Sequence, residues 1–419
     1  MSTFRHPLID RTLSVAAEGY AWLPNRVRES SSDVVRSRLL GRPAVALRGP
    51  DAMRFFYDER HVRRHGAIPE PVLGTLFGHG AVHTLDGPAH RARKSLFLPL
   101  LHVDSVAGLV EEVGRAWDEA VATWSGRSRV VLFEEAGTVL TRGVCDWAGV
   151  PLRHDEAAPL ARDLLAMVDG FAGLGPRHVR ARRARGRQEE RMARLVREVR
   201  AGNVPASDDS VLGRVARHTD ASGEPLDART AAVELLNVVR PTAAVAWFVA
   251  FSAHALHRWP GNREPLASGD IAHAAAFAHE VRRFYPFAPF LGGRAITDLT
   301  WRGEHIPAGC TVLLDVYGQH HDERLWGDPY AFRPRRFLDR PVERDMLIPQ
   351  GGGTPDAGHR CPGEHLTIGL LEALAVRLAR LEYEVPEQDL TIPLRRIPTR
   401  PRSGFVVSGV RAPAAAGAR

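Results

Sequence analysis

The sequence predicts one large, mainly α-helical domain of the α+β class that spans residues 1–419. Its length suits a single large helical domain as well as two or three smaller ones, and 44% of its residues are hydrophobic, which is ample for a buried core. The longest helical patterns lie at 104–124, 133–149 and 227–259, and the strand candidates at 43–48 and 130–133. An Ala/Gly-rich tail follows Arg411, and we expect residues 412–419 to be flexible.

The three cysteines are widely spaced and odd in number, so no disulfide framework is expected. This usage favours a reducing cytoplasm. The first residues lack the apolar stretch of a secretory signal or an anchor, and the apolar run at 243–253 is too short to cross a bilayer. We therefore expect a cytoplasmic protein without a membrane span.

The basic residues are almost all arginine, since Lys94 is the only lysine and the net charge is +7. They are densest at 177–187, where no aromatic residue that could stack on bases is interleaved. This pattern argues against nucleic-acid binding. It favours a solvated basic helix that could steer anionic substrates.

A glycine-punctuated loop at 76–87 precedes a predicted helix that starts at Pro88. His90 and Lys94 are four residues apart and therefore share one face of that helix. They are either ordinary surface bases or partners for an anion.

The apolar, glycine-rich stretch at 165–175 is typical of a pocket wall, with Val168 and Phe171 as its lining. A plain role in the core remains the alternative for both residues.

Arg240 and Pro241 interrupt the longest helical pattern, at 227–259. Proline inside a helix removes a hydrogen bond and bends the helix. Arginine in such an apolar setting is costly to bury without an anion, and Glu234 is six positions away on a different face. Arg240 is either paired with an acid elsewhere in the chain or held ready for an anionic ligand.

Near the end of the chain a glycine-rich loop, 349–363, presents Cys361 just before a predicted helix. Glycines let peptide N–H groups turn towards the sulfur, and the helix N-terminus adds partial positive charge. Both favour a thiolate, which is suited to ligate haem iron. The alternative is a buried structural cysteine.

Three further segments decide between these alternatives, namely Glu280-x-x-Arg283, Phe284-Tyr285-Pro286 and Pro334-Arg335-Arg336-Phe337. Followed by the cysteine loop, they appear in an order that resembles the haem-thiolate cytochrome P-450 superfamily over essentially the whole chain. The resemblance implies the cytochrome P-450 fold, a large helical domain with small β-sheets. Haem b (iron protoporphyrin IX) then lies between the long central helix and the cysteine loop.

The resemblance also assigns residues. It implies Cys361 as the iron ligand with Gly363 beside it, and His90 and Arg64 as partners of the haem propionates. A structural lock is implied at Glu280, Arg283 and Arg336.

Two departures from the common family pattern point to one branch. Arg240-Pro241 stands where most members carry an acid and an alcohol, with Thr242 one residue late, and the cysteine loop has extra residues and lacks the usual phenylalanine. Both resemble the bacterial fatty-acid peroxygenases, as do the stretches FGxGxxH, MVDxFxxxGPR and EVRRFYPFxPFLG. In that branch hydrogen peroxide is the oxidant and no redox partner is obligatory.

The expected substrate is a long- or medium-chain fatty acid whose carboxylate binds Arg240 beside the iron and serves as the acid–base group. Pro241 shapes this part of the site. The expected walls of the fatty-acid pocket are Phe77, Val168, Phe171, Ala244, Phe287 and Phe290. Because only the α and β carbons are within reach of the iron, the products are a hydroxy acid or, by decarboxylation, a terminal alkene.

His83 stands where typical hydroxylases of the branch carry glutamine and the alkene-forming decarboxylase carries histidine, so a mixture of products is expected. A loop histidine packed by its glycines is the alternative. Two rival functions remain for the whole protein, a ferredoxin-dependent monooxygenase and a non-catalytic haem-thiolate binding protein.

Overall fold

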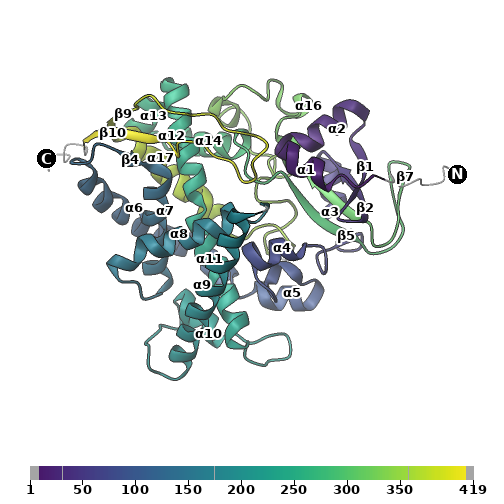
Figure 1. Cartoon of the computed structure of the whole chain (residues 1–419), viewed down its shortest axis with the longest axis horizontal. Coiled ribbons are helices and arrows are strands. Elements are labelled where there is room, and N and C mark those ends of the chain that lie inside the picture. The colour runs from purple at the N-terminus through teal and green to yellow at the C-terminus, as the bar shows by residue number, and fades with distance from the viewer. Residues whose placement is uncertain (1–8, 31, 174, 357, 412–419) are drawn as a thin grey trace.

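The computed structural model describes residues 9–30, 32–173, 175–356 and 358–411. A small β-rich region built from residues 9–63 and 290–315 lies beside a larger group of helices, and the two described ends of the chain lie on opposite sides (Figure 1). The mainly helical fold class with small sheets is confirmed. The predicted flexible tail at 412–419 lies outside the described residues, and the assignment to a single domain stays a prediction.

Three sheets are present in the described part of the chain. Their strands are β1 (Val34–Leu39), β2 (Arg42–Leu47), β3 (Val62–Arg63), β4 (Val130–Val131), β5 (Phe290–Ala295), β6 (Leu299–Trp301), β7 (Glu304–Ile306), β8 (Thr311–Asp315), β9 (Glu382–Glu384) and β10 (Val406–Arg411). The largest sheet has the order β1-β2-β8-β5-β3, with only β2 and β8 parallel, and the others are β4-β10-β9 and β6-β7.

The α-helices are α1 (Thr12–Glu18), α2 (Trp22–Ser30), α3 (Pro50–Tyr57), α4 (Glu70–Val72), α5 (Gly87–Lys94), α6 (Val103–Trp124), α7 (Leu132–Ala148), α8 (Ala157–Asp169), α9 (Pro176–Arg200), α10 (Val211–Arg217), α11 (Ala228–Ala243), α12 (Val245–Arg258), α13 (Arg263–Ser268), α14 (Ile271–Phe284), α15 (Val316–His320), α16 (Glu323–Trp326) and α17 (Glu364–Arg380). The predicted helices at 104–124 and 133–149 correspond to α6 and α7, and the predicted strand at 43–48 corresponds to β2.

Both faces of the large sheet carry apolar side chains, because successive residues of β2 contact different apolar clusters. Val45 and Leu47 of β2 belong to one apolar cluster with Phe56 of α3, whereas Ala46 between them belongs to a second cluster with Trp22 of α2. Successive side chains of a strand point to opposite faces, so α3 and α2 cover the two sides of the sheet.

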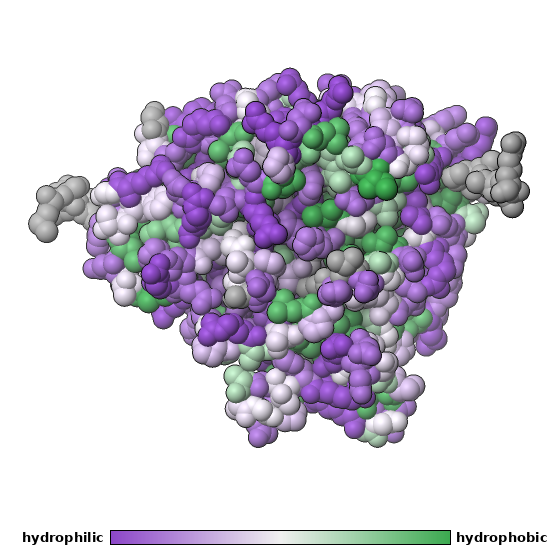
Figure 2. Space-filling view, turned by 180° about the vertical axis from the view of Figure 1, so that it is seen from behind, coloured by the Kyte–Doolittle hydropathy of each residue, from purple (hydrophilic) through white to green (hydrophobic). Residues whose placement is uncertain are grey.

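Helices α11 and α12 run through the main core, which they share with α6, α7 and α17. The helical segment Ala228–Arg258 is long and apolar enough to cross a membrane. However, 89% of its apolar 18-residue stretch is buried inside the fold. The face in Figure 2 is mostly hydrophilic, with its apolar residues in small separate groups. The length of this helical segment therefore reflects a core position.

Two local expectations differ from the structure. The chain does not break at Pro241, which lies inside α11, but at Ala244 between α11 and α12. Beyond the proline, the helix closes with the bond from Ala244 N–H to the Arg240 carbonyl, at 3.0 Å. The first five residues of the predicted irregular wall at 165–175 form the last turns of α8.

The basic helix α9 is only in part the solvated helix that the sequence predicts. Arg180 and Arg183 are exposed, but Arg185 is 2% exposed and binds Glu189 at 2.6 Å. It also donates to the carbonyls of Leu76, at 3.1 Å, and of Phe77, at 3.0 Å. Arg185 thereby attaches the turn before Gly78 to α9.

Glu280, Arg283 and Arg336 meet in the core. Glu280 and Arg283 of α14 are fully buried and bind each other at 2.7 Å, and Arg336 Nε lies 3.1 Å from the same carboxylate. Arg283 also donates to the carbonyls of His320, at 2.9 Å, and Pro329, at 2.8 Å. Helix α14 is thus tied to two later segments of the chain.

Removing the charge of Glu280 should therefore destabilise the fold strongly. Glu280→Gln leaves Arg283 buried without a counter-charge, and the free energy of unfolding should fall by about 3–5 kcal/mol. Denaturant titration followed by circular dichroism measures this loss. Asp51→Asn, which removes an exposed carboxylate with two arginine partners, is the control and should change little. Equal unfolding midpoints for the two variants would contradict the prediction.

Candidate active site

Cys361 lies on a loop that folds back on itself just before α17. Its N–H donates to the Gln350 carbonyl at 3.1 Å. Of the three cysteines, Cys145 and Cys310 are buried, whereas Cys361 stays partly accessible. A side chain added at Gly363 would approach nothing closer than the Cys361 sulfur, at 3.9 Å. The loop therefore leaves space between Gly363 and the sulfur, in a residue that is not fully buried.

The glycines of this loop are required by its packing on α3. A Cβ at Gly352 would come within 2.1 Å of Met53 Sδ, and a Cβ at Gly351 within 2.3 Å of Tyr57 Oη. Gly351 also has φ +91°, a conformation that L side chains rarely adopt. The glycine run that the sequence predicts as a close, irregular backbone is confirmed in this form.

A buried arginine of α14 anchors the loop. Arg282 is 1% exposed, donates to Gln350 Oε1 at 3.0 Å and forms an ion pair with Glu364. Arg360 binds the same glutamate at 2.6 Å. Arg282 was not among the site residues predicted from the sequence, although it directly precedes Arg283 in the pattern that pointed to the family.

The expected preference for a thiolate is only partly met in the protein alone. Desolvation by the surrounding protein raises the pKa of the Cys361 thiol, while the N–H of Gly363 and the charges of Lys94 and Arg282 act in the opposite direction. The predicted stabilising groups are present, but desolvation outweighs them. A thiol that coordinates a metal ion loses its proton outright, so bound iron would hold Cys361 as the thiolate.

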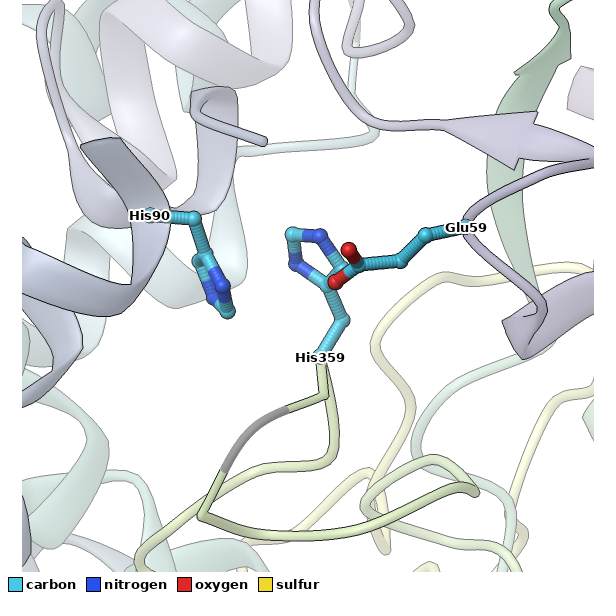
Figure 3. A group of neighbouring side chains, drawn as sticks. All are labelled: Glu59, His90 and His359. Carbon is cyan, nitrogen blue, oxygen red and sulfur yellow. The ribbon is translucent and has the colours of Figure 1, made fainter. Parts of the chain in front are cut away.

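His359 of the cysteine loop lies together with His90 of α5 and with Glu59, which comes from a third segment (Figure 3). The rings of His90 and His359 stack with centroids 4.0 Å apart, and His90 Nδ1 is buried without a hydrogen-bond partner. His359 was not predicted, although it is only two residues from Cys361. Nearby, Asp86 lies 3.3 Å from His359 Nε2. Desolvation lowers the pKa of both imidazoles, so the pair is a polar edge at which the unpartnered ring nitrogen of His90, Nδ1, is free to bind a further group.

Arg64 approaches from the sheet side. It is 8% exposed, its guanidinium lies 4.1 Å from the Phe56 ring centroid, and it donates to the Gly292 carbonyl at 3.2 Å. Burial lowers its pKa. No carboxylate among the described residues forms an ion pair with this guanidinium, so Arg64 is a second donor with capacity for an anion.

Arg240 is 6% exposed and is bound to no acidic side chain in the described part of the chain. Nη2 donates to Asn237 Oδ1 at 3.1 Å, Nε is buried without a partner, and the Phe77 ring centroid lies 5.8 Å from Cζ. Burial and, to a smaller extent, the charge of Arg185 lower its pKa to about 9, although a charge on Cys361 acts in the opposite direction. Arg240 is therefore a protonated cation close to the sulfur at neutral pH.

His83 lies in the short turn η3 (Val82–Thr84), and its ring centroid is 4.4 Å from that of Phe77. Its Nδ1 is buried without a hydrogen-bond partner. Desolvation, together with the charge of Arg240, lowers the pKa of His83 to about 3, so the ring is neutral at pH 7. The structure thus brings Arg240, His83 and Phe77 together.

The other predicted wall residues are spread more widely. Phe287 packs on Trp247 and Phe248, with ring centroids 6.2 and 5.0 Å away. Val168 and Ala244 are buried in the main core, and Phe171 is half-buried after α8. Phe290 packs instead on Trp22 of α2 at 6.3 Å. The contact of these residues with substrate stays a prediction.

Comparison with known proteins identifies this arrangement. Residues 270–404 match the family described as Cytochrome P-450. The structure superimposes on Cytochrome P450SP alpha with a TM-score of 0.94 and 39% identity, over 97% of this chain and 100% of that one. The chain belongs to the cytochrome P-450 family. It is also similar to cytochrome P-450 OleT, with a TM-score of 0.94 and 36% identity over 98% of this chain and 99% of that one.

The similarity to curated cytochrome P-450 sequences is lower or shorter. Cytochrome P-450 BJ-4 of Bradyrhizobium diazoefficiens is 26% identical over 80% of this chain and 78% of its own length. Cytochrome P-450 1A2 of Canis lupus familiaris is 37% identical over 26% of this chain, and the match spans only 22% of that relative. The chain thus belongs with P450SP alpha and OleT, the bacterial fatty-acid peroxygenase branch that the sequence predicts.

The residues present fit the haem that the cytochrome P-450 family implies. Cys361 would ligate the iron, because it is not fully buried and, apart from the chain neighbours of Gly363, only its sulfur among the described residues lies within 4 Å of a Cβ at Gly363. The unpartnered His90 Nδ1 and the buried Arg64 would hold the anionic propionates. His359, stacked on His90, would add a third group that the sequence analysis missed.

Proposed function

We propose that this cytochrome P-450 is a fatty-acid peroxygenase, which uses hydrogen peroxide to hydroxylate long- or medium-chain fatty acids at the α or β carbon and to decarboxylate them to terminal alkenes. P450SP alpha was solved with (R)-ibuprophen and a variant of OleT with arachidonic acid. Both ligands are carboxylic acids with an apolar body, which supports the same class of substrate here. A cytoplasmic location remains part of the proposal.

The observation that carries the proposal is the unpaired guanidinium of Arg240. Burying an arginine without a counter-anion is unfavourable, and within the described residues its only hydrogen bond goes to a neutral amide. A carboxylate bound there would supply the missing charge, and a guanidinium can bind both of its oxygens at once. The buried cation therefore favours an anionic substrate.

The same binding would supply an acid–base group. No acidic side chain occurs between Val238 and Ala244, the part of α11 near the cysteine. A substrate carboxylate on Arg240 would carry the proton that the cleavage of peroxide requires. Haem bound through Cys361 would supply the iron centre for that cleavage. The residues of the chain would bind the acid, orient its first carbons and exclude water.

Turnover with different oxidants tests the proposal. Haem-loaded enzyme is incubated with a long-chain fatty acid and either hydrogen peroxide alone or NADPH with a ferredoxin and its reductase, and products are quantified by mass spectrometry. We expect hydroxy acids and alkenes with peroxide alone. Products formed only with the redox partners would favour the monooxygenase. The absence of products under both conditions would favour a binding protein.

His83→Gln should shift products from alkene towards hydroxy acid. Neutral His83 lies beside Phe77, the ring that also faces Arg240, so the exchange alters polarity next to the expected first carbons of the substrate. Arg240 is unchanged, so the dissociation constant for the fatty acid should stay within about threefold, well under one power of ten. Product ratios and an absorption titration measure both quantities. An unchanged ratio of alkene to hydroxy acid would indicate that His83 only packs within its loop.

A further inference from the structure

Glu234 of α11 is a fully buried carboxylate that was not among the predicted site residues. Its Oε1 accepts from Arg93 Nη1 and from the backbone N–H of Val82, both at 2.8 Å. Its Oε2 accepts from Asn237 Nδ2 at 3.1 Å. The carboxylate thus joins three segments, namely α5, the loop before α5 and the next turn of α11.

Two of these bonds hold the loop that carries His83. Val82, whose N–H binds Glu234, directly precedes His83. Arg93, the charge partner of Glu234, also donates to the Gly80 carbonyl at 3.1 Å. One buried ion pair therefore holds the backbone of this loop at two points, Gly80 and Val82.

The third bond leads to Arg240. An ionised carboxylate only accepts hydrogen bonds, so Asn237 must direct its NH₂ group to Glu234 and its carbonyl oxygen to the other side. That oxygen accepts from Arg240 Nη2 at 3.1 Å. Glu234 therefore sets the orientation of the Asn237 amide. As a result, the Asn237 carbonyl oxygen, an acceptor, faces Arg240, and the NH₂ group, a second donor, does not.

We infer that Glu234 is a positioning residue that orients the Arg240 guanidinium and the His83 loop together, so that the carboxylate anchor and the loop histidine stay in one fixed arrangement. The inference rests on the proposed function. It deepens that function, because it makes affinity for the acid and the product ratio depend on a residue that would touch neither substrate nor haem.

The test is Glu234→Gln in the haem-loaded enzyme. Glutamine keeps the shape but loses the charge, and its amide cannot accept from all three donors. The dissociation constant for a long-chain fatty acid, from an absorption titration, should rise about tenfold or more, because a guanidinium that is wrongly oriented no longer binds both oxygens of the carboxylate. The alkene to hydroxy-acid ratio with peroxide should change as well.

A matched control separates positioning from stability. Asp315 is 1% exposed, binds Arg48 at 2.9 Å through Nε and accepts the Gly318 N–H at 2.8 Å. Asp315→Asn thus removes an equally buried, arginine-paired carboxylate from another element, β8. Asp315→Asn should lower the melting temperature about as much as Glu234→Gln does. It should leave the affinity for the fatty acid and the product ratio unchanged.

Asn237→Leu isolates the link to Arg240 and serves if Glu234→Gln does not fold. It leaves the bonds from Glu234 to Arg93 and Val82 in place, and it should raise the dissociation constant for the fatty acid. Wild-type affinity and product ratio in Glu234→Gln, or wild-type affinity in Asn237→Leu, would overturn the inference. A wild-type enzyme that binds the acid but does not use peroxide would refute the proposed function alone, because the binding comparison does not require turnover.

Discussion

Replacing Arg240 with leucine should raise the dissociation constant for a long-chain fatty acid by roughly 100- to 3,000-fold. The side chain is buried and has no acidic partner among the described residues, so in the variant a bound carboxylate would itself be buried without a counter-charge. Losing one partner of such a pair costs about 3–5 kcal/mol, which corresponds to that change in affinity. An absorption titration with the acid measures it.

The rate of peroxide-driven oxidation should fall together with affinity, because the acid–base group is lost from the site. A short acid gives an independent check. Acetate should let the wild type oxidise a substrate that lacks a carboxylate, since the small acid can occupy Arg240, whereas Arg240→Leu should gain little. If the variant oxidised long-chain acids with peroxide at nearly the wild-type rate, the role of the substrate carboxylate would be wrong, and the ferredoxin-dependent monooxygenase would become the better interpretation.

Replacing Cys361 with alanine should abolish the carbon-monoxide difference band of a thiolate-ligated haem and reduce peroxide-driven oxidation to background. Cys361 is the only cysteine in the sequence of the loop at 349–363. Arg282 and Glu364 anchor this loop. Most of the fold should survive, because these anchors do not involve the sulfur. Carbon-monoxide spectra and far-ultraviolet circular dichroism measure the two effects.

Cys310→Ala is the matched control for this variant. Cys310 is buried in the cluster around the large sheet, so its removal costs some packing free energy but should leave the thiolate band intact. A Cys361→Ala protein that kept the band would exclude Cys361 as the ligand, and loss of the band in Cys310→Ala would show that the spectrum reports on stability and not on ligation.

The chemistry of the site was largely predictable from short patterns. Cys361 is flanked by glycines that are close to it in the chain. Glu280 and Arg283 are three residues apart, a spacing that brings two side chains into contact on a helix. Arg240 was conspicuous because arginine followed by proline contradicts the apolar character of its helix. The helices α6 and α7 were predicted by periodicity alone.

Contacts between distant segments were decided only by the tertiary structure. Arg93 and Glu234 are 141 residues apart, and neither has a local pattern that names the other. The stack of His90 on His359 has the same origin. The burial of Arg185 within the basic run at 177–187 could not be predicted either. The charge of a residue does not reveal which side of a helix packs against its neighbours.

The sequence by itself thus singled out the side chains that we propose to carry the chemistry, Cys361 and Arg240, because their types and immediate neighbours are unusual wherever they pack. Only the tertiary structure decided how they are held. The orientation of Arg240 depends on Asn237 and, through it, on Glu234. The physical reason is that a hydrogen bond is directional and short-ranged, so it exists only once distant segments have been packed within about 3 Å of each other.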